Sequence, residues 1–184
     1  FFLDHDIDTG RIIAQREFPI PDDADVEYVY DGLMQLGAEL CIDTVDLVLS
    51  TDGDVPSQPQ QESEAHHVAP KIFKETCVID FSLSAKRIYD FVRGLSPVPG
   101  AWCMLTPRDA KAKAQVLKVY KAAKTGESSN GVEVGTLKAE NRRLLVATVD
   151  EWLELVELQP AGKKRMDARD YLNGFQHPED FLLK

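Results

Sequence analysis

Apolar residues recur at steps of three and four through residues 26–48, a spacing typical of an amphipathic helix. The stripe consists of Val26, Val29, Leu33, Leu36, Leu40, Thr44 and Val48. Three aspartates between positions 22 and 25 precede it, where the positive end of a helix dipole favours carboxylates. We therefore predict a long helix over residues 25–49. Because Gly32 and Gly37 weaken an isolated helix, packing must hold it or one of them bends it.

The first twenty residues read as strand, tight turn, strand. Apolar residues flank the sequence Asp6-Ile7-Asp8-Thr9-Gly10, in which Gly10 can supply the positive φ that a short reversal needs. Residues two apart share one face of a strand, so the Asp6 and Asp8 carboxylates could serve one site. Acids are also common in turns, and a solvated hairpin tip is the alternative interpretation.

Residues 54–70 are rich in proline, glutamine and serine and show no apolar period, which predicts an extended linker. Beyond it we predict a short helix capped by Ser82 or Ser84. Strand patterns follow at residues 101–106, 116–122, 132–139, 144–149 and 152–158. A last helix, residues 168–173, would be capped by Asp167. Short strands at close spacing favour a small barrel or curled sheet.

Charge divides the chain into two contrasting parts. Of the 184 residues, with a formal net charge of −10, residues 1–70 hold two basic residues against sixteen acids, a net charge of −14. Residues 71–184 hold nineteen basic residues against fifteen acids, a net charge of +4. This asymmetry indicates two domains with different partners, and the acidic average hides a basic second half suited to nucleic acid.

Several classes of protein are disfavoured by what the sequence lacks. No apolar run approaches the length of a membrane span, and no signal peptide opens the chain. The three cysteines have no metal-binding spacing and indicate reduced, buried thiols of a cytosolic protein. His66 and His67 are adjacent without a third ligand nearby, so we expect no metal site. Because the chain begins on an apolar strand at Phe1 rather than at Met, we expect a fragment.

The acidic turn carries a resemblance to a known family. The pattern Phe2-Leu3-x-x-Asp6-Ile7-Asp8-Thr9-Gly10-x-Ile12-Ile13-x-Gln15 resembles the acidic loop of the folate-dependent formyltransferases. In that family the aspartate before Thr or Gly is catalytic, which implies Asp8 as the catalytic residue here. Asp6 matches a more variable position, and Asp6, Thr9 and Gly10 are candidates for contact with the folate.

A second, more specific resemblance lies in the basic half. The sequence Leu-Gln-Pro-Ala-Gly-Lys-Lys-Arg-Met at residues 158–166, followed by Asp-Tyr-Leu-Asn-Gly at 170–174, resembles the C-terminal signature of the methionyl-tRNA formyltransferases. Residues 93–102 resemble the Phe-Asn-Pro-Trp-Pro-Gly-Ala stretch of the same family. Lys71 and residues 79–82 resemble its Lys…Ile-Asp-Trp-Ser segment. Leu95, Val98 and Phe81 depart from the commoner residues, conservatively.

The resemblance implies a fold and a reaction. Residues 1–53 would be an α/β remnant, a β-hairpin plus a long helix from a Rossmann-like formyltransferase domain. After the linker at 54–70, residues 71–184 would form an OB-fold-like β-barrel with short helices. The implied enzyme transfers a formyl group from 10-formyltetrahydrofolate to the α-amine of methionyl initiator tRNA in the cytoplasm, without a metal. The family's catalytic Asn and His and its Ser-Leu-Leu-Pro folate segment have no match here, so we expect the isolated chain to be inactive.

Basic side chains of the second half are candidates for contact with tRNA phosphates. They are the cluster Lys163, Lys164 and Arg165, the pair Lys71 and Lys74 at the domain entrance, and Lys86, Arg87 and Arg93 on the short helix. A solvated basic face is the alternative. Trp102 and Trp152, which have apolar neighbours, are expected in the core rather than as stacking platforms for bases.

Two other functions stay open. One is a sugar-nucleotide formyltransferase or a formyl-folate hydrolase, which share the Asp-Thr-Gly loop. The Gln-Pro-Ala-Gly-Lys-Lys stretch argues against both. The other is a non-catalytic RNA-binding barrel, against which the loop containing Asp8 argues. The full-length enzyme is expected to be a monomer, and the oligomeric state of this chain stays open.

Overall fold

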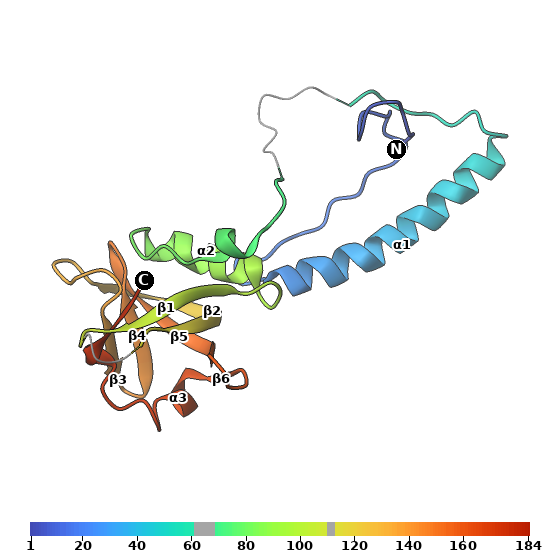
Figure 1. Cartoon of the computed structure of the whole chain (residues 1–184). Helices are drawn as coiled ribbons and strands as arrows, with labels where there is room; N and C mark the ends of the chain where they lie inside the picture. The colour runs from blue at the N-terminus through green and yellow to red at the C-terminus, as the bar shows by residue number, and fades with distance from the viewer. Residues whose placement is uncertain (61–68, 110–112) are drawn as a thin grey trace. The chain divides into compact units, whose positions relative to one another are not determined.

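The computed structural model describes residues 1–60, 69–109 and 113–184, and the chain divides into two compact units. The first unit holds residues 1–22 and 28–71, and the second holds residues 23–27 and 72–184 (Figure 1). His66, His67 and the rest of residues 61–68, within the predicted linker, lie outside the described residues.

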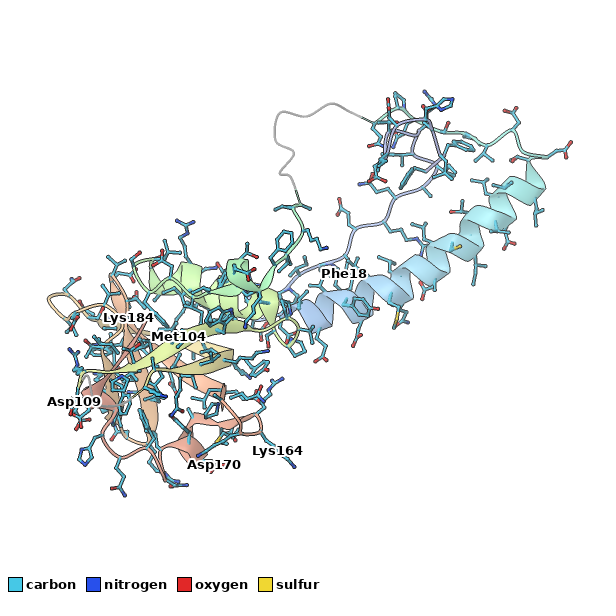
Figure 2. The ribbon with its side chains drawn as sticks, viewed as in Figure 1. Phe18, Met104, Asp109, Lys164, Asp170 and Lys184 are labelled. Atoms are coloured by element: carbon cyan, nitrogen blue, oxygen red, sulfur yellow. The ribbon has the colours of Figure 1, made fainter. Side chains whose placement is uncertain are left out.

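Helix α1 (Val26–Ser50), most of which belongs to the first unit, confirms the predicted long helix to within one residue at each end. Gly32 has a packing role, because a Cβ atom there would collide with the ring of Phe18. The Phe18 ring lies beside α1 (Figure 2), with its centroid 5.5 Å from that of Tyr28. None of the residues of α1 is buried, and Leu33 and Met34 are 49% and 61% exposed.

The predicted hairpin over the first twenty residues is wrong. The structure assigns no strand there, and a single bond from Phe2 N to Arg11 O (2.9 Å) crosses the turn. Ile12 pairs instead with Gln58, through backbone bonds of 2.8 and 3.0 Å. A two-stranded hairpin is marginal without further strands or a packing face, and here a distant segment takes its hydrogen bonds.

The second unit is built on one antiparallel sheet (Figure 1). Its strands are β1 (Ala101–Pro107), β2 (Gln115–Ser128), β3 (Leu137–Glu140), β4 (Arg143–Ala147), β5 (Glu151–Pro160), β6 (Met166–Asp167) and β7 (Phe181–Leu183). Their order is β3-β4-β5-β2-β1-β7, with β6 paired to β5. The five predicted strands are present, although β3 is shorter than expected, and β6 and β7 were not predicted.

The sheet closes on itself to form a nearly complete barrel. β7 pairs with β1, and a bridge between Thr136 and Leu182 brings the start of β3 to the other side of β7. The chain end adds two backbone bonds between Met104 and Lys184, of 2.7 and 3.0 Å, which lie side by side in Figure 2. The predicted small barrel is thus confirmed.

Helices cover parts of this barrel. In α2 (Ala85–Leu95), Ile88 and Val92 are 1% exposed and belong to the barrel core. Of the two predicted caps, Ser84 is the N-cap, and it accepts a bond of 3.4 Å from Arg87 N. The remaining helices are η1 (Lys74–Cys77), α3 (Ala168–Tyr171) and η2 (Pro178–Asp180). Asp167 stands at the N-cap position of α3, but its side chain makes no cap hydrogen bond.

The cysteines and tryptophans follow the prediction in part. Cys77 and Cys103 are free thiols in the core, whereas Cys41 is exposed. Burial raises the pKa of the Cys103 thiol well above its ordinary value. Trp152 is buried, and Trp102 is partly buried against the core with its indole Nε1 donating to Lys74 O at 2.9 Å.

Candidate functional site

The acidic loop of the first unit presents Asp6 and Asp8 to solvent. Asp8 has a φ of 61°, in the left-handed region that residues with a side chain seldom adopt. The Thr9 hydroxyl donates to Asp6 O at 3.1 Å. Within residues 1–60, 69–109 and 113–184, no basic side chain pairs with the Asp8 carboxylate, so its charge is open to a ligand or to another protein group.

Contacts of one glycine and one glutamine hold this loop. Gly10 is buried, and a Cβ atom on it would collide with the carbonyl oxygen of Phe2. Gln60 donates from Nε2 to the carbonyls of Asp8 and Gly10. Gln60 was not among the predicted site residues, because a glutamine in a polar linker carries no local signal of a partner fifty residues away.

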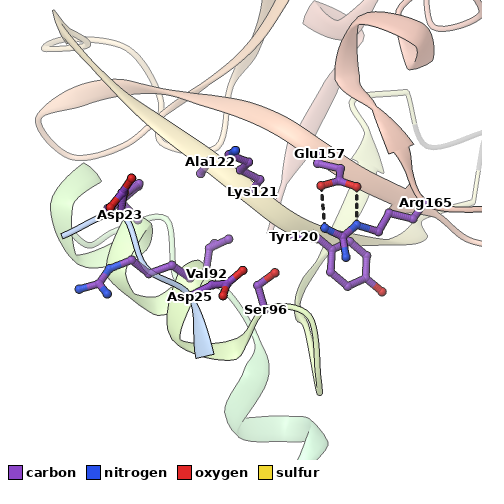
Figure 3. Close-up of a pocket in the computed structure, with 11 residues that line it drawn as sticks. Asp23, Asp25, Val92, Ser96, Tyr120, Lys121, Ala122, Glu157 and Arg165 are labelled. Carbon is purple, nitrogen blue, oxygen red and sulfur yellow. Dashed lines mark hydrogen bonds and ion pairs between the residues drawn. The ribbon is translucent and has the colours of Figure 1, made fainter. Parts of the chain in front are cut away.

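In the second unit, Arg165 anchors the loop between β5 and β6, residues 161–165. Its guanidinium forms a two-bond ion pair with Glu157, in which Nη2 lies 2.6 Å from Oε2 (Figure 3). The guanidinium also stacks over the Tyr120 ring at 4.4 Å. Hydrogen bonding to Glu157 raises the pKa of Arg165 above its ordinary value. The charge predicted for tRNA is therefore partly neutralised within the fold.

Gln159 supplies a second anchor for the same loop. Its Oε1 accepts from the Tyr120 hydroxyl at 2.9 Å, and its Nε2 donates to Lys163 O at 2.9 Å. Lys163 and Lys164 are exposed, and among the described residues their ammonium groups have no hydrogen-bond or ion-pair partner. Figure 2 shows Lys164 at the outer edge of the second unit. The loop is thus a fixed backbone that presents two free cations.

A cavity of about 280 Å³ lies beside this loop, within the second unit. Its lining brings together residues from α2, β2 and β5 with the short segment that precedes α1, among them Asp23, Asp25, Arg93, Lys121 and Arg165 (Figure 3). Two of the predicted cations, Arg93 and Arg165, therefore share one polar cavity with three carboxylates, those of Asp23, Asp25 and Glu157.

Three of the predicted cations, Lys74, Lys86 and Arg93, have partners within the fold. Asp90 accepts from Lys86 Nζ at 2.6 Å and from Arg93 Nε at 2.9 Å. Burial alone would raise the pKa of Asp90, but the bonds from Lys86 and Arg93 outweigh it and hold that pKa below its usual value. Arg93 also donates to Ala24 O at 2.9 Å. Lys74 lies over the Trp102 ring at 5.6 Å.

Arg87 and Lys71 complete the set of predicted cations. Arg87 is exposed on α2, and its guanidinium has no hydrogen-bond or ion-pair partner in the described part of the chain. Lys71 is exposed at the end of the first unit.

A second cavity lined by charged residues was not predicted from the sequence. A cavity of about 320 Å³ is lined by Arg142, Arg143 and Arg169 together with Glu154, Asp167 and Asp170. Arg143 is paired with Glu127 at 3.1 Å. Arg142 and Arg143 are adjacent at the turn from β3 into β4, and the fold brings Arg169 of α3 close to them.

Two further kinds of feature are absent from the residues that the structure describes. These residues contain no group of three or more His, Cys, Asp or Glu side chains arranged to hold a metal ion. They also contain no helix that is both long and apolar enough to span a membrane.

Comparison with known proteins gives one family and a consistent set of relatives. Residues 71–176 match the family described as formyl transferase, C-terminal domain. Proteins named methionyl-tRNA formyltransferase are similar: that of Parabacteroides distasonis is 48% identical over 188 residues, and that of Bacteroides fragilis 42%. Each alignment covers 100% of this chain and 56% of the relative. The chain thus spans just over half the length of these curated relatives.

Solved structures show a similar fold. HypX from Aquifex aeolicus, in a variant with six substitutions, aligns with a TM-score of 0.60 and 19% identity over 94% of this chain and 29% of that one. HypX in complex with tetrahydrofolic acid aligns with a TM-score of 0.59 and 18% identity. At this identity, the likeness concerns the fold alone.

Proposed function

This chain belongs to the formyl transferase family, whose C-terminal domain it contains at residues 71–176, and we propose that it acts as part of a methionyl-tRNA formyltransferase. The reaction would move a formyl group from 10-formyltetrahydrofolate to the α-amine of methionine esterified to initiator tRNA, in the cytoplasm. The observation that carries the proposal is the similarity to enzymes of that name along the whole chain, at 48% and 42% identity.

Asp8 is proposed as the catalytic residue of this chain. The attacking amine must lose a proton, and the tetrahedral oxyanion must be stabilised. A carboxylate beside an imidazolium orients the ring and favours its charged form, so Asp8 would serve a histidine that has no match in this sequence. The exposed and unpaired carboxylate supports this role. Asp6, Thr9 and Gly10, in the same loop, are the proposed neighbours of the folate, and no metal is required.

The proposed tRNA face lies on the barrel, which we assign as OB-fold-like, with the domain bounds 1–53, 54–70 and 71–184. Lys163 and Lys164 are its leading residues, because two free ammonium groups on an anchored loop suit phosphate contact. Arg165 supports the loop through Glu157. Five further cations are proposed to make weaker contacts with the tRNA: Lys71, Lys74, Lys86, Arg87 and Arg93.

An acceptor panel tests the proposal. The complete enzyme that carries this sequence is given 10-formyltetrahydrofolate with methionyl initiator tRNA, an amino sugar nucleotide or water alone. Formylation of the tRNA should exceed the other two reactions by orders of magnitude, and the 184-residue chain alone should be inactive. Equal hydrolysis without an acceptor would indicate a formyl-folate hydrolase, and transfer to the sugar would indicate a sugar-nucleotide formyltransferase.

A further inference from the structure

The carboxamide of Gln60 joins two carbonyls of the acidic loop. Its Nε2 lies 2.7 Å from Asp8 O and 2.8 Å from Gly10 O. A side-chain amide has two N–H donors, so these two bonds use its full donor capacity. The two acceptors flank Thr9, and the carboxamide therefore spans the three residues that contain Asp8.

The backbone at Asp8 has a disfavoured conformation that needs stabilising contacts. Asp8 has a φ of 61°, where an L-residue is disfavoured relative to glycine. Within the same loop, the Thr9 hydroxyl donates to Asp6 O at 3.1 Å, and Gly10 packs against Phe2 where no side chain would fit. The carbonyls of Asp8 and Gly10 converge on one nitrogen only while the loop keeps this turned conformation.

The position of Gln60 follows from a register set by neighbouring bonds in the first unit. Ile12 and Gln58 form an antiparallel bridge with backbone bonds of 2.8 and 3.0 Å. Moving two residues along each segment of an antiparallel pair places Gln60 opposite Gly10. Arg11 strengthens this pairing by donating to Ser57 Oγ at 3.0 Å and to Ser57 O at 2.5 Å.

We propose that Gln60 is a positioning residue for Asp8. Its two hydrogen bonds hold the Asp8 backbone in the left-handed conformation, and this conformation sets the direction of the Asp8 carboxylate. Gln60 itself does not touch substrate or folate. The inference rests on the catalytic role proposed for Asp8, and it gives Gln60, within the predicted linker, a part in supporting the active site.

The kinetic test uses the complete enzyme that carries this sequence. Gln60→Glu keeps the size of the side chain but puts an acceptor oxygen against two carbonyls, and Gln60→Ala removes the brace. Both should lower kcat about 10- to 100-fold with KM for methionyl-tRNA nearly unchanged, because misplaced catalytic groups cost this much. The matched control is Gln58→Ala, since Gln58 bonds to Ile12 through its backbone, and it should keep kcat within about twofold.

A structural test is independent of activity. In the 184-residue chain, Gln60→Ala should shift the amide resonances and the HN–Hα couplings of Asp8 and Thr9, whereas Gln58→Ala should leave them in place. Unchanged resonances in the Gln60 variants would overturn the inference whatever the kinetics.

The outcomes separate the two proposals. Loss of activity in Asp8→Asn with full kcat in both Gln60 variants overturns the positioning role alone. Full activity in Asp8→Asn overturns the catalytic proposal and, with it, the reason for a positioning residue. A fall in kcat that only matches the fraction of enzyme unfolded at the assay temperature also counts against Gln60.

Discussion

The carboxylate of Asp150 accepts a hydrogen bond of 2.9 Å from the backbone amide of Ala85, the first residue of α2. The same oxygen accepts from the Thr148 hydroxyl and from Glu151 N, each at 2.9 Å. The turn between β4 and β5 is thereby tied to the start of a helix sixty-five residues earlier in the chain. Ser84, the residue before the helix, caps the same N-terminus through its side chain, so α2 has both a local and a distant cap.

Asp150→Asn keeps an acceptor oxygen but loses the charge, so it is expected to reduce stability by roughly 0.3–1 kcal/mol, the usual contribution of a carboxylate near a helix N-terminus. The backbone bond from Ala85 is the largest cause that holds the pKa of Asp150 below its usual value. A lowered folded-state pKa means that the stabilisation is present above the unfolded value near 3.8 and is lost as pH falls through the folded pKa. Urea unfolding at pH 7 and at about pH 3 measures both effects.

The control for that experiment is Asp180→Asn, because Asp180 is exposed and its side chain has no partner among the described residues. The wild-type chain should lose more stability than Asp150→Asn on acidification. Parallel loss in both would show that Asp150 does not carry the pH effect.

Gly135→Ala should open the barrel where β3 meets β7. Gly135 has a φ of 84°, and a Cβ there would collide with Leu183 O, while its own backbone bonds to Ala147 O and Leu183 N at 2.8 and 2.9 Å. Left-handed strain and disturbed bonds together should cost about 2–3 kcal/mol. Denaturant unfolding of the chain measures this loss.

Gly131→Ala is the matched control for the barrel, since Gly131 has a φ of 83° with nothing within 4 Å of the position that a Cβ would take. It should show the backbone strain without the collision. If both variants lose the same stability, close packing against Leu183 has no role in barrel closure.

Replacing Lys163 and Lys164 together with alanine should weaken binding of initiator tRNA by the chain. The dependence of log affinity on log salt should flatten by just under one unit for each phosphate that these lysines neutralise in the wild type. Arg165→Ala should change the salt slope much less, because its charge is already paired with Glu157. Titrations at several salt concentrations measure the slope. An unchanged slope in the double variant would move the RNA face to Lys71, Lys86 and Arg93, or to the arginines around Arg142.

Asp8→Asn in the complete enzyme should fold normally, because the side chain is exposed, and should lower kcat by roughly two to four orders of magnitude. Asp6→Asn should cost far less. Single-turnover formylation separates the chemical step from tRNA binding. Similar losses in both variants would mean that the two acids act as a unit or that Asp6 is the catalytic one.

Local signals in the sequence determined the elements whose stabilisation is local. The 3.6-residue apolar period predicted α1 within one residue of Val26–Ser50, and Ser84 was one of two residues predicted to cap α2. Alternation predicted β1, where one buried face imposes a period of two, and strand runs divided by Gly, Asn and Asp predicted β2, β4 and β5. The loop motif likewise identified Asp8 as the candidate acid, since its residues are adjacent in the chain.

Only the tertiary structure decided which distant groups meet. Ile12 pairs with Gln58 instead of closing a hairpin, Gln60 reaches Asp8 across fifty-two residues, and Arg165 forms an ion pair with Glu157. β7 has three residues and no period of its own, yet it closes the barrel against Thr136. The physical reason is that such contacts depend on register and loop closure between segments, which the pattern within either segment does not encode.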